Sequence, residues 1–434
     1  MIESIRAALR RAGVRPAAAA LLLSMAAPAA AEPGPPVRLQ PGGTEKVCQV
    51  LGEFDRQKGQ PTVNLTASRF RFWGGDLGAS VEHEGRLYFL FGDTHPVPHT
   101  VWRERDADSI AVSETTDPEH CVHLTFLMDS DGGYRQLKIP GIFQGAFAVP
   151  SGGLSLNGNL YVWHTSDVPD RGFSARSVLA RSDNDGYSFD YLFDLSRETL
   201  VHVSPALVPE GSMPELPPHE GDGVLLFGTG LFRGSDAYLG FMPADGIENP
   251  NTLRHFAGLD GGGKPVWTAD ESESAPLFRH GCMGEFSAAW NPFVEKWVML
   301  YTCGGARAHT FLRTADQPWG PWSEAEMLFD PAWDIAGCEF LHIAPPPDVV
   351  AAGGEPCPVV TDPHTPFNLG EAYGPYLIDR FTTGEKGKSS TIYFLMSTWN
   401  PYTVVLMKAT LVVDGRGDVG AAWPAGPKHD RLLP

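Results

Sequence analysis

The chain has 434 residues, of which 42% are apolar, and 33 Lys and Arg stand against 52 Asp and Glu. The net charge of −19 argues against nucleic-acid binding, and no run of about 18 apolar residues is present to span a membrane. The 48 Gly and 38 Pro in a chain with this much apolar material indicate a well-packed protein built from many short strands.

The first 31 residues show the three parts of a secretory signal peptide. A basic segment is followed by the apolar stretch Ala17–Met25 and then by the small residues Ala29, Ala30 and Ala31, as at a cleavage site. The apolar stretch is too short for a membrane span. We therefore predict that residues 1–31 are removed on export and that the protein is periplasmic or secreted. The basic residues are Arg6, Arg10, Arg11 and Arg15.

One sequence unit recurs five times in the rest of the chain. Its centre is an apolar strand that ends in small polar residues, with another strand before it and another after it, across turns such as Asn157-Gly158. Antiparallel units repeated in this way are typical of propeller blades. The central strands are predicted at Leu87–Asp93, Leu160–Ser166, Val224–Gly230, Trp297–Cys303 and Ile392–Thr398.

These repeats predict an all-β fold, a five-bladed β-propeller, over residues 66–425. Residues 32–65 are predicted to be an N-terminal extension, and residues 426–434 a C-terminal tail. A sandwich or barrel with repeated hairpins is the alternative, but five matched units favour the propeller.

All six cysteines follow the predicted signal peptide. An even number in an exported chain favours disulfides, although six cysteines allow fifteen connectivities. We favour the local bridges Cys282–Cys303 and Cys338–Cys357, which leave Cys48 for Cys121. A CxxC zinc pattern is absent from the sequence, and we expect no metal and no cofactor.

Two aspartates in the first unit form the candidate catalytic pair. If the first hairpin turns at Glu84-Gly85, Asp76 and Asp93 face each other across its two strands, with Cβ atoms about 4.5–5.5 Å apart. Repulsion between them would raise one pKa and leave one acid protonated. A separation of roughly 5–5.5 Å is typical of retaining glycosidases. We expect Asp76, which begins the innermost strand, to be the nucleophile and Asp93 the general acid/base; the alternative is that both are turn residues bonded to backbone amides.

Three further polar residues are candidates for substrate binding. Glu285 opens the inner strand of the fourth unit and is expected to point toward the channel, as a third acid or a ligand for hydroxyl groups. His95 and His164 end second strands at the same rim and are predicted to donate hydrogen bonds to hydroxyls or to a carboxylate. A surface glutamate and two histidines bonded to backbone are the alternatives.

Three aromatic residues are predicted near channel-facing strand ends, where aromatic faces can stack on sugar rings. They are Trp73, Tyr376 and Trp399, and packing between blades is the alternative for each. Asp106 and Asp108 precede the third strand of the first unit and are candidates to orient the aspartate pair, with a turn role as the favoured alternative. The segment Ser182–Phe189 matches an Asp-box turn, which we interpret as structural.

The segment WGGDLGASVEHEGRLYFLFGDT, which contains both aspartates, resembles the opening of the proteins grouped as domain-of-unknown-function family 4185. Part of that family is classed as glycoside hydrolase family 183. The later segments VPSGGLSLNGNLYVWHTS, EFSAAWNPFVEKWVMLY and IYFLMSTWNPYTVVLM are also similar, in the same order, so the resemblance extends from about Ser68 to Val413. It implies a five-bladed propeller and, as in the characterised branch, internal cleavage of D-arabinan with retention by Asp76 and Asp93.

These observations lead to one leading hypothesis and two alternatives. The leading one is an exported glycoside hydrolase that cuts an arabinofuranose-containing glycan internally by a retaining mechanism with two aspartates. The alternatives are a non-catalytic carbohydrate-binding or scaffold propeller, and an inverting hydrolase that uses Asp76 with Glu285 across the channel. The expected partner is a polysaccharide or glycan substrate, and no feature of the sequence bears on the oligomeric state.

Overall fold

The computed structural model describes residues 34–96, 107–145, 147–167, 174–304, 308–331, 340–342 and 369–414. Four predictions lie outside these residues: the signal peptide, a role for Asp106, the Cys338–Cys357 bridge, and the tail over residues 426–434. They stay predictions.

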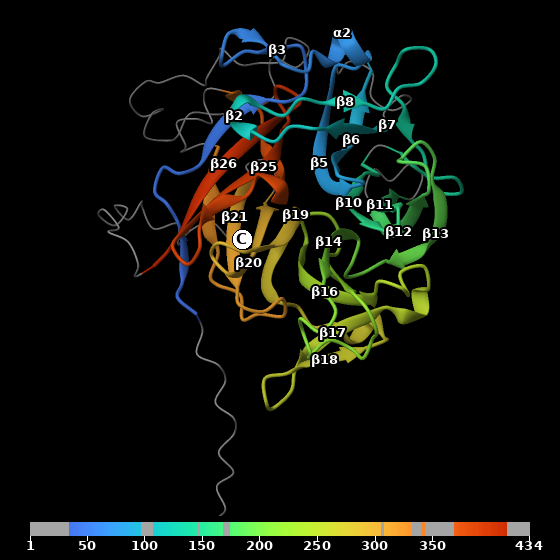
Figure 1. The fold of residues 1–434 in the computed structure, drawn as a ribbon, viewed down its shortest axis with the longest axis vertical. Coiled ribbons are helices and arrows are strands. Elements are labelled where there is room, and N and C mark those ends of the chain that lie inside the picture. Colours follow the sequence, from blue (N-terminus) through green and yellow to red (C-terminus); the bar gives the residue numbers. More distant parts are fainter. Residues whose placement is uncertain are drawn as a thin grey trace, which may run out of the picture.

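The described residues form a five-bladed β-propeller (Figure 1). The first strand of each blade contacts the first strands of the blades before and after it, and these contacts close into a ring. The predicted fold class and the five central strands are therefore confirmed. The first strands are β5 (Gly74–His83), β10 (Pro150–Leu156), β14 (His202–Val208), β19 (Phe278–Asn291) and β23 (Ala372–Leu377).

Within each blade the remaining strands continue outward in antiparallel order, and β16 and β19 also join the third and fourth blades into one sheet. The second strands are β6 (Arg86–His95), β11 (Asn159–Asp167), β15 (Gly223–Thr229), β20 (Lys296–Cys303) and β25 (Ser389–Thr398). The third are β7 (Ala107–Ser113), β12 (Ser174–Ser182), β16 (Ser235–Pro243), β21 (His309–Ala315) and β26 (Thr403–Val413). The outer strands are β8 (Thr125–Phe126), β9 (Gln136–Leu137), β13 (Asp190–Ser196), β17 (Arg254–Leu259), β18 (Pro265–Thr268) and β22 (Glu326–Phe329). In the fifth blade, β24 (Thr383–Glu385) pairs with the second strand β25.

Short elements complete the described part of the chain. They are the hairpin β3 (Phe54–Asp55) and β4 (Gln60–Pro61), the helix α2 (Thr66–Phe70), and the 3-10 turns η1 (Pro118–His120), η2 (Pro250–Thr252), η3 (Glu271–Glu273) and η4 (Asp379–Phe381). None of the helices in this part of the chain is long and apolar enough to cross a membrane.

The N-terminal strands complete the fifth blade. In the segment expected as an extension, β1 (Val37–Leu39) and β2 (Glu45–Gln49) both pair with β26. The register places Val37 opposite Val413. The last blade is therefore built from both ends of the described chain.

Apolar clusters between neighbouring blades form the core, because the alternating side chains of each sheet face the next sheet. Two of the predicted disulfides are confirmed: Cys48–Cys121 ties β2 to the first blade, and Cys282–Cys303 joins β19 to β20. The Asp-box turn closes the hairpin between β12 and β13, where the Ser182 hydroxyl accepts a hydrogen bond from the Gly186 amide at 2.9 Å.

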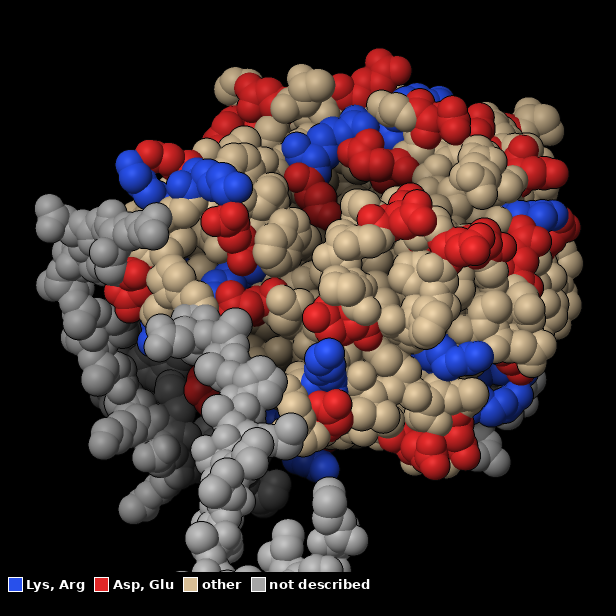
Figure 2. Space-filling model, turned by 60° about the horizontal axis from the view of Figure 1, so that its bottom comes forward, with Lys and Arg blue, Asp and Glu red and all other residues tan. Residues whose placement is uncertain are grey.

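Acidic side chains are spread over the face shown in Figure 2, with basic side chains between them. They do not gather into one patch on that face. On this face the acidic residues therefore belong to the solvated surface, which is the usual place for Asp and Glu.

Candidate active site

The pairing of β5 with β6 is irregular at the point where the two aspartates lie. From the turn to Ala79 the register is the predicted one, with His83 opposite Arg86. Gly78 then forms a bulge in β5, and the register shifts by one residue. Asp76 consequently faces Gly92, so the prediction of a direct Asp76–Asp93 pair is wrong.

Gly78 has a physical reason to form this bulge. Its φ is +112°, a conformation that L side chains rarely adopt, and an added Cβ would lie 2.5 Å from Leu395 Cδ1. A second bulge in β6, where Asp93 and Thr94 together face Gly75, restores the register. Bulges of this kind redirect side chains, and here they bring two acids to one cavity.

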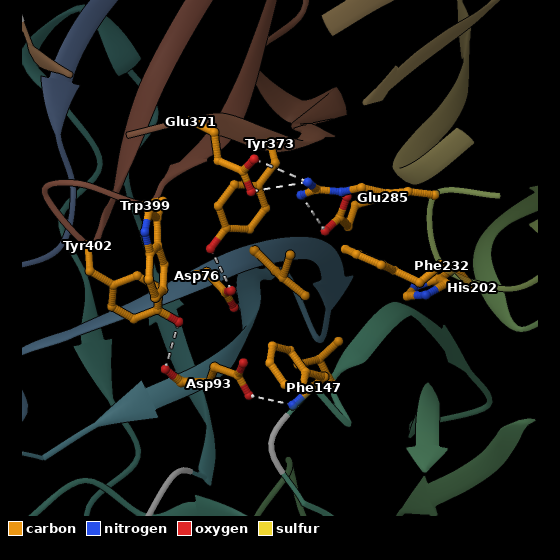
Figure 3. Close-up of a pocket in the computed structure, with 13 residues that line it drawn as sticks. Asp76, Asp93, Phe147, His202, Phe232, Glu285, Glu371, Tyr373, Trp399 and Tyr402 are labelled. Atoms are coloured by element: carbon orange, nitrogen blue, oxygen red, sulfur yellow. Dashed lines mark hydrogen bonds and ion pairs between the residues drawn. The ribbon is translucent and has the colours of Figure 1, made fainter. Parts of the chain in front are cut away.

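The two aspartates line a cavity of about 310 Å³ at the centre of the ring (Figure 3). All five blades contribute to it, either from their strands or from the segments that precede or join them. The lining residues are Asp76, Leu77, Asp93, Phe147, Val149, His202, Phe232, Arg233, Glu285, Glu371, Tyr373, Trp399 and Tyr402.

Asp76 is 7% exposed and takes its hydrogen bond from a neutral group: the Tyr373 hydroxyl donates to Oδ2 at 2.8 Å. Its Oδ1 is buried without a partner among the described residues. Burial raises the pKa of Asp76 to about 7, with Glu285 also raising it and the Tyr373 hydrogen bond opposing the rise. Gly92 leaves room for the carboxyl group, because a Cβ there would lie 2.8 Å from Oδ1.

Asp93 is 9% exposed and has a left-handed backbone, with φ of 33°. The Phe147 amide donates to its Oδ1 at 3.4 Å, and the Tyr402 hydroxyl donates to its carbonyl at 3.0 Å. Figure 3 shows both carboxyl groups at the same cavity, with Tyr373 beside Asp76 and Phe147 beside Asp93. An amide donor stabilises the ionised form of a carboxyl group.

The opposite side of the cavity holds two glutamates and a cation. Arg233 lies 3.1 Å from Glu371 and 3.4 Å from Glu285, and its guanidinium also lies over the ring of Tyr373. Burial lowers the pKa of Arg233, but the two glutamates raise it further, so this group is a permanent cation. Burial raises the pKa of Glu371, and the neighbouring Arg233 opposes that rise.

Unsatisfied polar atoms and aromatic faces complete the walls. His202 is buried with neither ring nitrogen bonded to a described residue, and Glu285 Oε2 is likewise without a partner. Burial lowers the pKa of His202, so the imidazole is neutral near pH 7 and offers one donor and one acceptor. Phe147 and Phe232 are 45% and 46% exposed.

Half of the eight residues predicted for the site line this cavity, namely Asp76, Asp93, Glu285 and Trp399. The other four, Trp73, His95, His164 and Tyr376, do not. His164 is fully buried and bonded to Asp108, and Tyr376 is buried in the core between blades. Their strands have the predicted positions, but the inter-blade packing covers these two side chains.

The remaining two, His95 and Trp73, lie close to the cavity but do not line it. His95 is buried and packs its ring edge-on against Tyr402, with centroids 4.9 Å apart. Its charge interaction with Asp76 tends to lower the pKa of that acid. Trp73 lines a separate cavity of about 100 Å³ between the N-terminal segment and Tyr402.

Five residues that line the cavity were not predicted from the sequence, namely Arg233, Glu371, Tyr373, His202 and Tyr402. Arg233 has φ of 49° and lies between β15 and β16, outside any repeated strand. Glu371 immediately precedes β23, the first strand of its blade, and so lies just outside the repeated strand.

One group in the described part of the chain has the spacing of a metal site, His280 with Cys282 and Cys303. The two cysteines form a disulfide, which leaves a single histidine as a ligand. This group therefore does not fit a metal ion.

Solved structures that are similar to this chain share little of its sequence. No curated protein matches it in sequence. Among solved structures, it is similar to a candidate hydrolase from Bacteroides ovatus, with 10% identity, a TM-score of 0.48, and coverage of 79% of this chain and 87% of that chain. For an endo-1,5-alpha-L-arabinanase from Thermotoga petrophila the identity is 13%, the TM-score 0.41, and the coverage 78% and 72%.

The GH43 protein BlXynB from Bacillus licheniformis is 11% identical, with a TM-score of 0.39 and coverage of 84% of this chain and 54% of that protein, so the chain spans about half of its length. A family model also matches most of the chain. The family described as a domain of unknown function, DUF4185, matches residues 62–408. This match takes in every blade and both aspartates of the cavity, and the chain therefore belongs to the DUF4185 family.

Proposed function

We propose that the protein is a glycoside hydrolase that cleaves an arabinofuranose-containing glycan internally, with Asp76 and Asp93 as the reacting carboxyl groups. One observation carries the proposal: two bulges in one hairpin bring a buried acid with a raised pKa and a second acid to the same cavity. Hydrolysis of a glycosidic bond needs two carboxyl groups in different protonation states.

The environments of the two acids suggest their roles. Asp76, with a pKa of about 7, holds its proton near neutrality and would protonate the leaving oxygen. Asp93 has a backbone amide on Oδ1, which favours the carboxylate that a nucleophile requires. From the sequence we expected the opposite roles, with Asp76 as the nucleophile, because Asp76 begins the innermost strand.

In the first step, Asp93 attacks the anomeric carbon while Asp76 gives its proton to the departing oxygen, which leaves a glycosyl ester on Asp93. In the second step, Asp76 takes a proton from water, the oxygen of that water attacks the anomeric carbon, and the bond to Asp93 breaks. The configuration is retained because the carbon is displaced twice.

The inverting alternative requires Glu285 to act as a free base. That carboxylate is instead engaged in an ion pair with Arg233, 3.4 Å away. We therefore assign Glu285 and the neutral His202 to the binding of sugar hydroxyls, because both have buried polar atoms without described partners.

Three aromatic side chains, Phe147, Phe232 and Trp399, give the cavity faces on which sugar rings can stack. A second cavity of about 540 Å³, lined in part by Gln136 and Lys138, shares Asp93 with the first. A glycan chain that passes Asp93 would occupy both cavities, which supports cleavage inside a chain. The arabinofuranose unit itself is proposed from the resemblance of the opening motif.

We also propose that the protein acts outside the cytosol. Its two described disulfides suit an oxidising compartment, as does the predicted signal peptide.

The test is a screen of the purified protein against D-arabinan, L-arabinan, xylan and β-1,3-galactan, with product lengths and the anomer of the first product measured. We expect D-arabinan to be shortened from within, with retention. Asp76→Asn and Asp93→Asn should each lower the rate by about 10³-fold or more, whereas Asp183→Asn, an exposed turn residue, should not. Full activity in either cavity variant would reject the site, and an inverted product would reject the mechanism.

A further inference from the structure

A buried aspartate–histidine pair lies close to the backbone of Asp93. Asp108 on β7 and His164 on β11 are both buried, and His164 Nε2 lies 2.7 Å from Asp108 Oδ2. His164 has no exposed surface, so it does not reach a substrate in either cavity. Its predicted role as a sugar ligand is therefore not supported by its position.

The hydrogen bonds around His164 fix where the protons are. Nδ1 lies 2.5 Å from the carbonyl oxygen of Thr165, which can only accept, so Nδ1 carries a hydrogen. The contact between Nε2 and Asp108 Oδ2 then needs one more proton, which belongs either to the imidazole or to the carboxyl group. In both cases the pair has no net charge, which suits its burial.

Gln144 locks the pair in place. Its amide nitrogen donates to the Leu137 carbonyl at 3.1 Å and lies 3.4 Å from Asp108 Oδ2, while its oxygen accepts the Ile139 amide at 2.8 Å. Asp108 is thus held by a histidine and a glutamine that are themselves held by backbone groups.

The pair reaches the cavity through the backbone of Asp93. Asp108 lies opposite the bulge of β6 that contains Asp93, because Phe91 faces Ser109 and Thr94 faces Ala107 on either side of it. The Asp93 backbone amide is among the groups that lower the pKa of Asp108. Asp93 is the residue of the β6 bulge with a left-handed φ of 33°, which costs free energy in a residue other than glycine. A contact between the Asp93 amide and the carboxyl group of Asp108, which is itself held in place, offsets that cost.

We propose that Asp108 and His164 are positioning residues that hold the Asp93 backbone in its left-handed conformation and so aim its carboxyl group into the cavity. The proposal rests on the proposed function only in assigning Asp93 to the reaction. The hydrogen bonds of Phe147 and Tyr402 to Asp93 complete the same arrangement from the other sides.

Four variants separate positioning from general stability. Asp108→Ala and His164→Leu remove the contacts, whereas Asp108→Asn and His164→Gln can preserve them. In Asp108→Asn the amide oxygen accepts the Asp93 N–H and the amide nitrogen donates to neutral Nε2; in His164→Gln the amide nitrogen replaces Nε2 as donor. Asp55→Ala is the control, because Asp55 forms an equally buried ion pair with Lys46 away from the cavity.

We expect Asp108→Ala and His164→Leu to lower kcat on the cleaved glycan by about 10²-fold with KM changed less than about threefold, since a misplaced reacting group costs rate rather than binding. The two conservative variants should recover kcat to within about tenfold of the wild-type value, and Asp55→Ala should lose stability but not kcat. Unchanged kcat in the disruptive variants, a loss confined to KM, or no recovery in the conservative ones would overturn the proposal.

A crystal structure of Asp108→Ala provides a readout that does not depend on activity. We expect the φ of Asp93 to leave the left-handed region, and an unchanged Asp93 would reject the positioning role. If the wild-type protein cleaves no glycan, the proposed function fails, and this comparison still decides whether the pair positions Asp93.

Discussion

The two sides of the cavity treat their carboxyl groups differently. Glu285 and Glu371 share the cation of Arg233, whereas Asp76 takes a hydrogen bond from the neutral hydroxyl of Tyr373. Arg233 opposes the rise that burial causes in the pKa of Glu371, whereas burial of Asp76, beside a neutral donor, raises its pKa to about 7. The number of acids in a cavity therefore says little about its chemistry, because the partner of each carboxyl group influences its protonation state.

The largest effect is expected from removing the cation. Arg233→Met leaves two buried or half-buried carboxyl groups without compensation, and should lower the free energy of unfolding by about 3–5 kcal/mol in urea titrations. Arg197→Met is the control, because Arg197 is exposed in its ion pair with Asp194 and should change stability by less than about 1 kcal/mol. Equal midpoints of urea unfolding for the two variants would contradict the proposal that Arg233 compensates the charge of the two glutamates.

Next in size is a change on the Asp76 side. Gly92→Ala places a Cβ 2.8 Å from Asp76 Oδ1 and 2.7 Å from Val149 Cγ1, so the carboxyl group must move. We expect kcat to fall by about 10²-fold in a protein that still folds by circular dichroism. Gly261→Ala, where no heavy atom lies within 4 Å of the added Cβ, should behave as wild type. Normal activity in Gly92→Ala would show that the space beside Asp76 is not needed.

A smaller effect concerns stability and pH. The folded-state pKa of Asp76 is about 7, above its unfolded value near 3.9, so its contribution to stability is complete at low pH and is lost as pH rises through 7. Asp76→Asn should therefore exceed the wild type in free energy of unfolding by on the order of 2 kcal/mol at pH 8. The difference should vanish below about pH 4. A difference independent of pH would mean that the pKa of Asp76 is not raised.

The smallest effect is expected from the tyrosine. The Tyr373 hydroxyl stabilises ionised Asp76, so Tyr373→Phe should raise the pKa of Asp76 and shift the alkaline limb of the pH–rate profile upward by about one unit. Tyr191→Phe, which removes an exposed hydroxyl bonded to Asp194, is the matched control. An alkaline limb that does not shift in Tyr373→Phe would show that the ionisation of Asp76 does not determine that limb.

The fold was largely predictable because each blade repeats the same local signals. Apolar strands such as Leu87–Asp93 and the turn at Glu84-Gly85 have the predicted positions, and the register near that turn is correct. Cys282–Cys303 was predicted because its cysteines are close together in sequence, and Cys48–Cys121 as the pair left over. Periodicity and turn chemistry are local properties, and a repeated sequence displays them five times.

The site was predictable only in part, because it depends on departures from that regularity. Gly78 shifts the register by one residue, which no count from the turn includes. Arg233 lies in a turn with a positive φ, where strand patterns carry no information. His164 and Tyr376 were placed on the correct strands, but contacts between distant segments decide whether such side chains face a cavity or the core.

The shared fifth blade has a consequence for the order of folding. Since β1 pairs with β26, the ring can close only after nearly the whole described chain is available, whatever the earlier blades have already done. The cavity draws its walls from every blade, so it is completed by the same late event. A chain shortened at either end of this blade would retain most of its hairpins and yet lack the enclosed space in which Asp76 meets Tyr373.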